Sequence, residues 1–259
     1  MPAPFLFMTF PFDLQLFVIA AAVFTGAYII FGISAFGAAL FTVPILSHFL
    51  PLDFVLPMCA LIDMAAALAL GVRFSRDADW SELKWLVPLS AAGAVAGVTL
   101  LVALPRAATI AGIGVFLVGY GIYALRQPEA VRRVSRAWGP VAGFIGGACG
   151  TLFGVGAPPY AIYLTHRVHD KLAFRATLSN MVIFSVSIRV VVFALSGFML
   201  AERLIGFALL VPFALAGLWI GNRIHGRVSR AGLLRVVAGL LLLIGLSLLA
   251  RALVPGAPA

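Results

Sequence analysis

Ten apolar segments, separated by short polar stretches, follow one another along the 259-residue chain. Several of them are long enough, as helices, to cross about 30 Å of hydrocarbon. No polar stretch between them is longer than about a dozen residues, so we expect no soluble domain. The pattern predicts an all-α polytopic membrane protein, with apolar segments at 14–33, 36–50, 52–72, 83–104, 107–125, 137–152, 156–168, 173–200, 203–222 and 231–253.

Two of the apolar runs contain a break. Leu14–Leu50 is 37 residues long, about 55 Å as one helix, which is too long for a single crossing. The stretch "FGISAFG" (Phe31–Gly37) interrupts this run, and "GACGTLFGVGAPPY" (Gly147–Tyr160) interrupts a later one. The adjacent prolines of the second break suit the first turn of a new helix. We therefore expect two helical hairpins, each entering and leaving by one face of the membrane.

The Lys and Arg residues distinguish hairpins from simple helix kinks. With hairpins, fourteen of them lie on one face and three on the other, and Arg189 lies within the membrane. With kinks, the two faces would carry nine and eight. The positive-inside rule favours the hairpins, and it predicts a bacterial inner-membrane protein with both termini outside the cytoplasm. Because the net charge of +9 lies in short loops, nucleic acid is excluded as a partner.

The two halves of the chain repeat in the same order. At an offset of 117 residues Asp63 aligns with Asn180, and at an offset of 124 Gly93-x-x-x-Gly97 aligns with Gly217-x-x-x-Gly221. The glycine pairs predict close helix crossings. Each half holds one hairpin and three crossings, so the second half is expected to be inverted. The predicted architecture is one membrane domain made of two inverted repeats, residues 1–130 and 131–259.

Three stretches carry a resemblance to a known family. They are "FGAALFTVPIL" (Phe36–Leu46), "GTLFGVGAPPYAIYL" (Gly150–Leu164) and "LAFRATLSN" (Leu172–Asn180). They resemble the sulfite exporter TauE/SafE family, also called the toluenesulfonate uptake permeases, and the likeness covers nearly the whole chain. It implies transport of sulfur-containing anions such as sulfite or organosulfonates. The chain differs from the family in the few glycines of its first turn and at Asp63, where small hydroxyl residues are more usual.

The two glycine turns predict an anion site. Each turn precedes a helix whose first N–H groups are unpaired and carry partial positive charge, and glycine lets an anion approach the backbone closely. The alternative is that the glycines only allow tight helix packing. The residues expected to bind the anion are Gly37, Gly154, Gly156, Pro158, Pro159, Asn180 and Arg189.

Two charges are isolated in apolar segments. Arg189 has no charged neighbour between Arg175 and Glu202, and a charge at that depth needs a partner. It holds an anionic head group, forms a structural ion pair, or extends its charged end to the outer face of the membrane. Asp63 takes up a proton as the anion binds, or it neutralises Arg189. These alternatives stay open at the level of the sequence.

Other polar residues fit structural roles. Asp53 and Asp170 each precede an apolar helical run and are expected to be N-caps. Tyr160 and Tyr163 either line a cavity or pack. No cysteine–histidine or carboxylate–histidine cluster suggests an enzyme or a metal site, and no nucleotide-binding motif or cofactor is expected.

These observations predict a secondary transporter for a small sulfur-containing anion and argue against an enzyme. A passive anion channel on the same scaffold and a structural membrane subunit are the alternatives. The expected partners are the anion and the lipid bilayer. Proton coupling, association with further copies of the chain, the direction of transport and the particular anion stay open.

Overall fold

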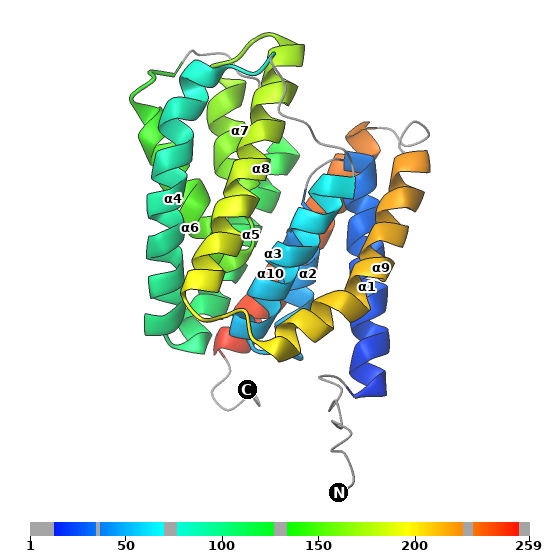
Figure 1. The fold of residues 1–259 in the computed structure, drawn as a ribbon. Helices are drawn as coiled ribbons and strands as arrows, with labels where there is room; N and C mark the ends of the chain where they lie inside the picture. Colours follow the sequence, from blue (N-terminus) through cyan, green and yellow to red (C-terminus); the bar gives the residue numbers. More distant parts are fainter. Residues whose placement is uncertain (1–12, 35–36, 70–76, 127–133, 225–229, 254–259) are drawn as a thin grey trace, which may run out of the picture.

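Ten helices and no strand are formed by the residues that a computed structural model describes, 13–34, 37–69, 77–126, 134–224 and 230–253 (Figure 1). Each apolar segment of the sequence corresponds to one helix, which confirms the all-α prediction. The helices are α1 (Leu14–Ser34), α2 (Ala39–Leu46), α3 (Leu52–Ala69), α4 (Trp80–Ala103), α5 (Arg106–Arg126), α6 (Trp138–Phe153), α7 (Ala157–Thr165), α8 (Lys171–Leu195), α9 (Ala201–Ile224) and α10 (Arg230–Leu253).

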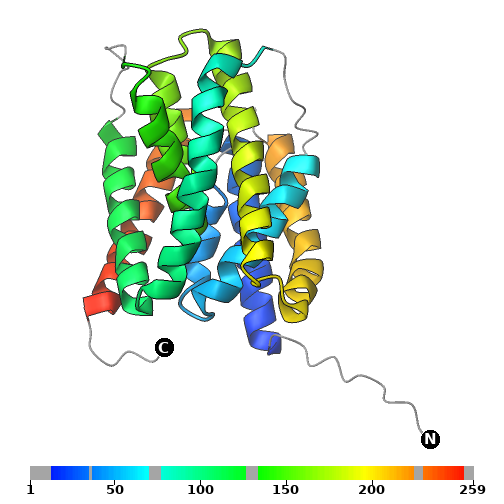
Figure 2. The same cartoon turned by 60° about the vertical axis from the view of Figure 1, so that its left-hand side comes forward.

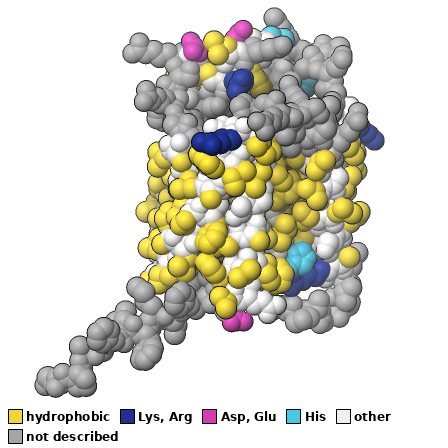
Figure 3. Space-filling view, turned by 90° about the vertical axis from the view of Figure 1, so that its right-hand side faces the viewer, with side chains coloured by type: hydrophobic (Ala, Val, Ile, Leu, Met, Phe, Trp, Pro, Cys, Tyr) yellow, Lys and Arg dark blue, Asp and Glu magenta, His cyan; other side chains and the backbone are white. Residues whose placement is uncertain are grey.

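Six helices in the described part of the chain are long and apolar enough to cross a membrane, by length and composition: α1, α3, α4, α5, α8 and α9. Many of their apolar side chains face outward, as Val102 and Leu195 do with exposures of 70% and 84%. Figure 3 shows hydrophobic side chains over the middle of one face, with charged side chains near its two ends. An exposed apolar belt of this kind suits contact with lipid tails.

Both predicted breaks are present. Helix α6 ends at Phe153 because Gly154 adopts a left-handed conformation, with φ of +77°, that favours glycine. Helix α7 then begins at Ala157 with a proline in its first turn. Gly37, with φ of +93°, precedes α2 in the same way. Figures 1 and 2 show α7 returning to the end of the bundle where α6 begins, and α2 returning to the opposite end, where α1 begins.

The two hairpins differ in the length of their first arm. Helix α1 has 21 residues and α6 has 16. At about 1.5 Å per residue, α1 is long enough to cross the hydrocarbon by itself, whereas α6 is not. The first hairpin thus combines one full-length arm with the short helix α2.

The N-cap predictions have different outcomes. Asp170 caps α8, and its carboxylate accepts a hydrogen bond from the Ala173 amide at 2.7 Å. The prediction for Asp53 is wrong, because this residue lies inside the first turn of α3. Its carboxylate accepts from the Arg203 guanidinium of α9 at 3.0 Å. A charged partner on the neighbouring helix therefore takes the place of a backbone amide.

The paired glycines mark two close helix crossings, as predicted. A Cβ atom added to Gly93 of α4 would lie 2.0 Å from the Phe144 carbonyl oxygen of α6. A Cβ atom added to Gly217 of α9 would lie 2.3 Å from the Thr25 carbonyl oxygen of α1. The pairs α4–α6, α1–α9 and α5–α10 have the most extensive contacts between described helices.

Candidate functional site

Arg189 lies at the break between α6 and α7. It projects from α8, is 5% exposed, and donates hydrogen bonds to the Gly150 and Gly154 carbonyl oxygens at 3.0 and 2.9 Å. These carbonyls belong to the last turn of α6, where the helix leaves them without intrahelical partners and with partial negative charge. The guanidinium therefore stabilises the end of the broken helix.

Asp63 of α3 pairs with Arg189. Its Oδ2 atom accepts a hydrogen bond from Arg189 Nη2 at 2.7 Å, and its Oδ1 atom accepts one from the Tyr28 hydroxyl at 2.6 Å. The ion pair answers a question that the sequence left open, because the two isolated charges are in direct contact. It joins α1 and α3 of the first half to α6 and α8 of the second half.

Two features of the pair are suited to a ligand. The Asp63 side chain is 17% exposed, whereas the Arg189 side chain is 6% exposed. Arg189 Nε is buried and has no hydrogen-bond partner in the described structure. A buried guanidinium N–H without an acceptor is costly, so this donor is suited to an incoming oxygen atom.

The second glycine turn approaches the first hairpin closely. A Cβ atom added to Gly154 would lie 2.7 Å from Val43 of α2. Gly154 thus has three constraints: a positive φ, a carbonyl that binds Arg189, and contact with α2. The structure brings together Gly154, Arg189 and Asp63 among the residues that the sequence singled out.

Other predicted site residues lie elsewhere or serve packing. Pro158 and Pro159 line a pocket of about 290 Å³ with Phe116 and Tyr120 of α5. Since neither proline has an N–H group, α7 begins with fewer free donors than an ordinary helix, which weakens it as an anion site. Gly156 approaches the Gly146 carbonyl oxygen, as the packing alternative expects.

Two further predicted residues, Asn180 and Gly37, are not among the hydrogen-bond partners of Arg189 in the described part of the chain. Asn180 is fully buried on α8. The backbone of Gly37 lies beside the Leu40 side chain at the start of α2. Their roles in binding stay predictions.

Several polar residues were not expected from the sequence. No sequence pattern singled out Tyr28 as a site residue, because a tyrosine within an apolar run usually packs against its neighbours. Ser90 and Ser185 flank the Tyr160 hydroxyl at 2.6 and 3.2 Å. Serines on separate helices carry no pattern that would pair them with a tyrosine, so only the tertiary structure reveals this cluster.

A second charge cluster lies at the end of the bundle where α4 begins. Glu82 is buried and accepts hydrogen bonds from Arg167 at 2.7 Å, from Arg136 at 3.2 Å and from the Tyr163 hydroxyl. The hydrogen bonds to Glu82 raise the pKa of Arg167 above its ordinary value. This cluster links α4 to the segments that flank α6 and α7. Tyr163 belongs to it through its hydrogen bond to Glu82, so it packs and does not line a cavity.

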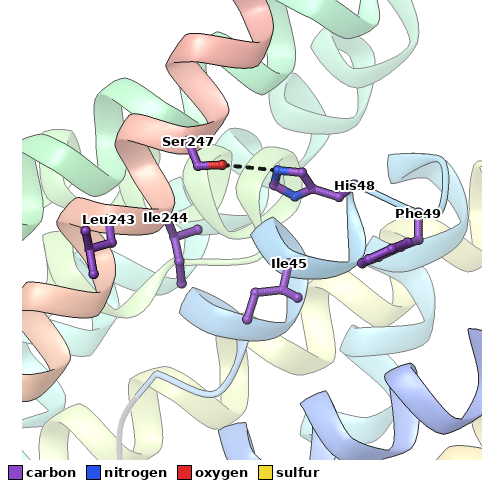
Figure 4. Close-up of a pocket in the computed structure, with 6 residues that line it drawn as sticks. All are labelled: Ile45, His48, Phe49, Leu243, Ile244 and Ser247. Atoms are coloured by element: carbon purple, nitrogen blue, oxygen red, sulfur yellow. Dashed lines mark hydrogen bonds between the residues drawn. The ribbon is translucent and has the colours of Figure 1, made fainter. Parts of the chain in front are cut away.

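An apolar pocket lies apart from Arg189. It has a volume of about 330 Å³ between the end of α2 and α10 (Figure 4). His48 contributes its Nε2 atom at 3.5 Å from the Ser247 hydroxyl, while its Nδ1 atom lies 2.9 Å from the Pro44 carbonyl oxygen. Ile45, Phe49, Leu243 and Ile244 complete the lining, which suits an apolar occupant more than a small anion.

Broken helices, an exposed apolar belt and a buried charge pair at a helix break define a polytopic membrane protein of the transporter class. The chain belongs to the sulfite exporter TauE/SafE family, whose sequence profile matches residues 18–248. It is also 25% identical over 190 residues to a protein of Comamonas testosteroni named "Probable inner membrane transporter protein TsaS". That match covers 73% of this chain and 80% of the relative. No solved structure matches the chain.

Proposed function

We propose that the chain is a secondary transporter that moves a small sulfur-containing anion, such as sulfite or an organosulfonate, across the inner membrane. The family and the name of the relative support the substrate class and the location. The observation that carries the proposal is the Arg189–Asp63 pair, since it places the deepest cation of α8 at a helix break with its carboxylate partner still partly exposed.

Two inverted repeats are the architecture that best accounts for the helix packing. The contact of α4 with α6 corresponds to that of α9 with α1 when the two halves are exchanged, and the contact of α4 with α8 corresponds to that of α9 with α3. The matched glycine pairs lie at the first of these corresponding contacts. In such proteins the substrate site lies between the repeats, where Arg189 and Asp63 meet.

The anion replaces Asp63 as the partner of Arg189. Both carry negative charge, so they compete for one guanidinium at close range in a partly hydrated site. Protonation of Asp63 weakens its hold on Arg189 and removes its repulsion of the anion. Anion binding and proton uptake are then coupled, which permits a proton gradient to drive accumulation.

Exchange across a membrane tests the proposal. Purified protein in liposomes loaded with unlabelled sulfite should take up external radiolabelled sulfite at a saturable rate. That rate should exceed the rate in empty liposomes, because alternating access links the two half-cycles. Flux that rises linearly with the gradient and shows no exchange would identify a channel. No flux of sulfite, thiosulfate or sulfonates would contradict transport by the chain alone.

A further inference from the structure

A cluster of three hydroxyl groups lies one helical turn from Arg189. It comprises Ser90 of α4, Tyr160 of α7 and Ser185 of α8, with the tyrosine oxygen 2.6 Å from Ser90 Oγ and 3.2 Å from Ser185 Oγ. Ser90 and Tyr160 are fully buried, whereas Ser185 is partly exposed. Ser185 is thus the end of the cluster that a ligand can reach.

The serines do not make the hydrogen bond that hydroxyl groups in helices often make. Thr25, Thr99 and Thr151 each donate to the carbonyl oxygen four residues earlier in their own helix. Ser90 and Ser185 instead turn toward Tyr160. Within the described residues, two mutual hydrogen bonds join three hydroxyl groups, so one of the three O–H donors is left for a further acceptor.

Arg189 supplies the second free donor. Its Nε atom is buried without a partner. Ser185 and Arg189 are four residues apart on α8, which places both on one face of the helix with Cβ atoms about 6 Å apart. Both side chains also face the same glycine break, because Arg189 binds the Gly150 carbonyl and a Cβ atom added to Gly156 would lie 3.3 Å from Ser185 Oγ.

We propose that Ser185, supported by Tyr160 and Ser90, binds the oxygen atoms of the transported anion together with Nε of Arg189. The proposal rests on the proposed function and adds the chemistry of recognition. Directional N–H and O–H donors from one helix face suit an anion that presents several oxygen lone pairs, as sulfite and the sulfonate group do. Chloride is a spherical ion without oxygen atoms, so it gains less from donors that point in fixed directions.

The cluster joins the two halves of the molecule, and the sequence repeat does not reproduce it at the equivalent positions. The residues aligned with Ser90 and Tyr160 in the sequence repeat are Ala214 and Val43, which are fully buried and apolar. A hydroxyl cluster that served only to pack the repeats against each other would be expected at both equivalent places. Its presence beside Arg189 alone points to the ligand.

Titration calorimetry on the purified protein tests this role with sodium sulfite, sodium methanesulfonate and sodium chloride as probes. Ser185→Ala and Tyr160→Phe should weaken binding of sulfite and methanesulfonate about tenfold or more, as loss of one hydrogen bond to a charged group does. Ser247→Ala on α10 and Tyr123→Phe on α5, where Tyr123 stacks on Tyr120, are matched controls outside the cluster and should leave all affinities unchanged. Binding of chloride should be weak throughout and should not respond to either change.

Two results would overturn the proposal. If both variants bind sulfite with wild-type affinity, the cluster serves packing only. If the variants lose sulfite and chloride binding equally, the substitutions disturb the site in general and the cluster does not recognise oxygen atoms. If Tyr160→Phe does not fold, Ser185→Ala is judged by the same criteria, because it removes one oxygen atom from a partly exposed position. Failure of the wild-type protein to bind any of the three anions would contradict the proposed function itself.

Discussion

At the scale of single residues, the ion pair of Arg189 and Asp63 has both a structural and a functional part. Arg189 satisfies two carbonyls at the end of α6 while it holds Asp63. Removing one member of a buried pair leaves an uncompensated charge and typically costs about 3–5 kcal/mol. A substitution that keeps the charge or the shape of one side chain therefore distinguishes the structural role from the binding role better than alanine does.

Arg189→Lys is one such substitution. Lysine keeps the positive charge for Asp63, but its single ammonium group cannot reproduce a planar fork that contacts Asp63 and two carbonyls together. We expect a folded protein with a melting temperature a few degrees lower and sulfite affinity reduced at least about tenfold. Thermal unfolding and calorimetry on the same sample measure both quantities. Unchanged sulfite affinity would remove the guanidinium from the binding site.

Asp63→Asn tests the coupling. In the wild-type protein, methanesulfonate, which stays an anion throughout the pH range, should bind more tightly as the pH falls, because protonated Asp63 no longer competes for Arg189. Asparagine imitates the protonated carboxyl group, so the variant should bind well without this pH dependence and should lose proton-driven accumulation in liposomes. Exchange of sulfite in the absence of a pH gradient should persist. A pH dependence like that of the wild type would make Asp63 a purely structural partner.

At the scale of helices, the close crossings depend on the absence of side chains. Gly93 and Gly217 bring α4 against α6 and α1 against α9 at distances that exclude even a methyl group. Without a hydrophobic driving force between helices in lipid, such close packing is a main source of stability. The crossings also position the hairpins, because α6 and α1 are their first arms.

Gly93→Ala and Gly217→Ala should each destabilise the protein. The added Cβ atom would overlap a backbone carbonyl of the partner helix, so the helices must separate at a cost of about 1–3 kcal/mol. Gly239→Ala is the matched control, since nothing lies within 4 Å of a Cβ atom added in the middle of α10. Thermal unfolding in detergent compares the three variants. Equal melting temperatures for Gly93→Ala and the control would contradict the close crossing.

At the scale of the whole molecule, the sequence predicted the helices better than the site. Long apolar runs and glycine breaks are local signals, so each apolar segment matched a helix and Gly154 ended one as expected. The sequence also isolated Arg189 and Asp63, because charges in apolar runs are conspicuous. It could not reveal that Tyr28 would contact Asp63 or that Ser185 would contact Tyr160, since those contacts link separate helices through side chains with no distinctive spacing.

The positions of the charged residues make a final prediction about orientation. Arg106, Arg203 and Arg251 belong to the end of the bundle where α5 and α9 begin and α10 ends, and Arg126, Arg136 and Arg167 belong to the other (Figure 1). With the richer end in the cytoplasm, the start of α9 faces outward. Arg203 is buried and pairs with Asp53, so the neighbouring Glu202, which is exposed, is the better position for labelling this end of α9.

Single cysteines introduced at Glu202 and Ala107 should react with a membrane-impermeant maleimide added to intact cells, and cysteines at Ser135 and Ala137 should react only after the cells are opened. All four positions are exposed, so accessibility reports the side of the membrane and not burial. The background should carry Cys59→Ala and Cys149→Ala, which remove the native thiols. The reverse labelling pattern would invert the orientation but keep the hairpins. A different response at Glu202 and Ala107 would place the starts of α9 and α5 on opposite faces, which two hairpins entering from opposite ends do not allow.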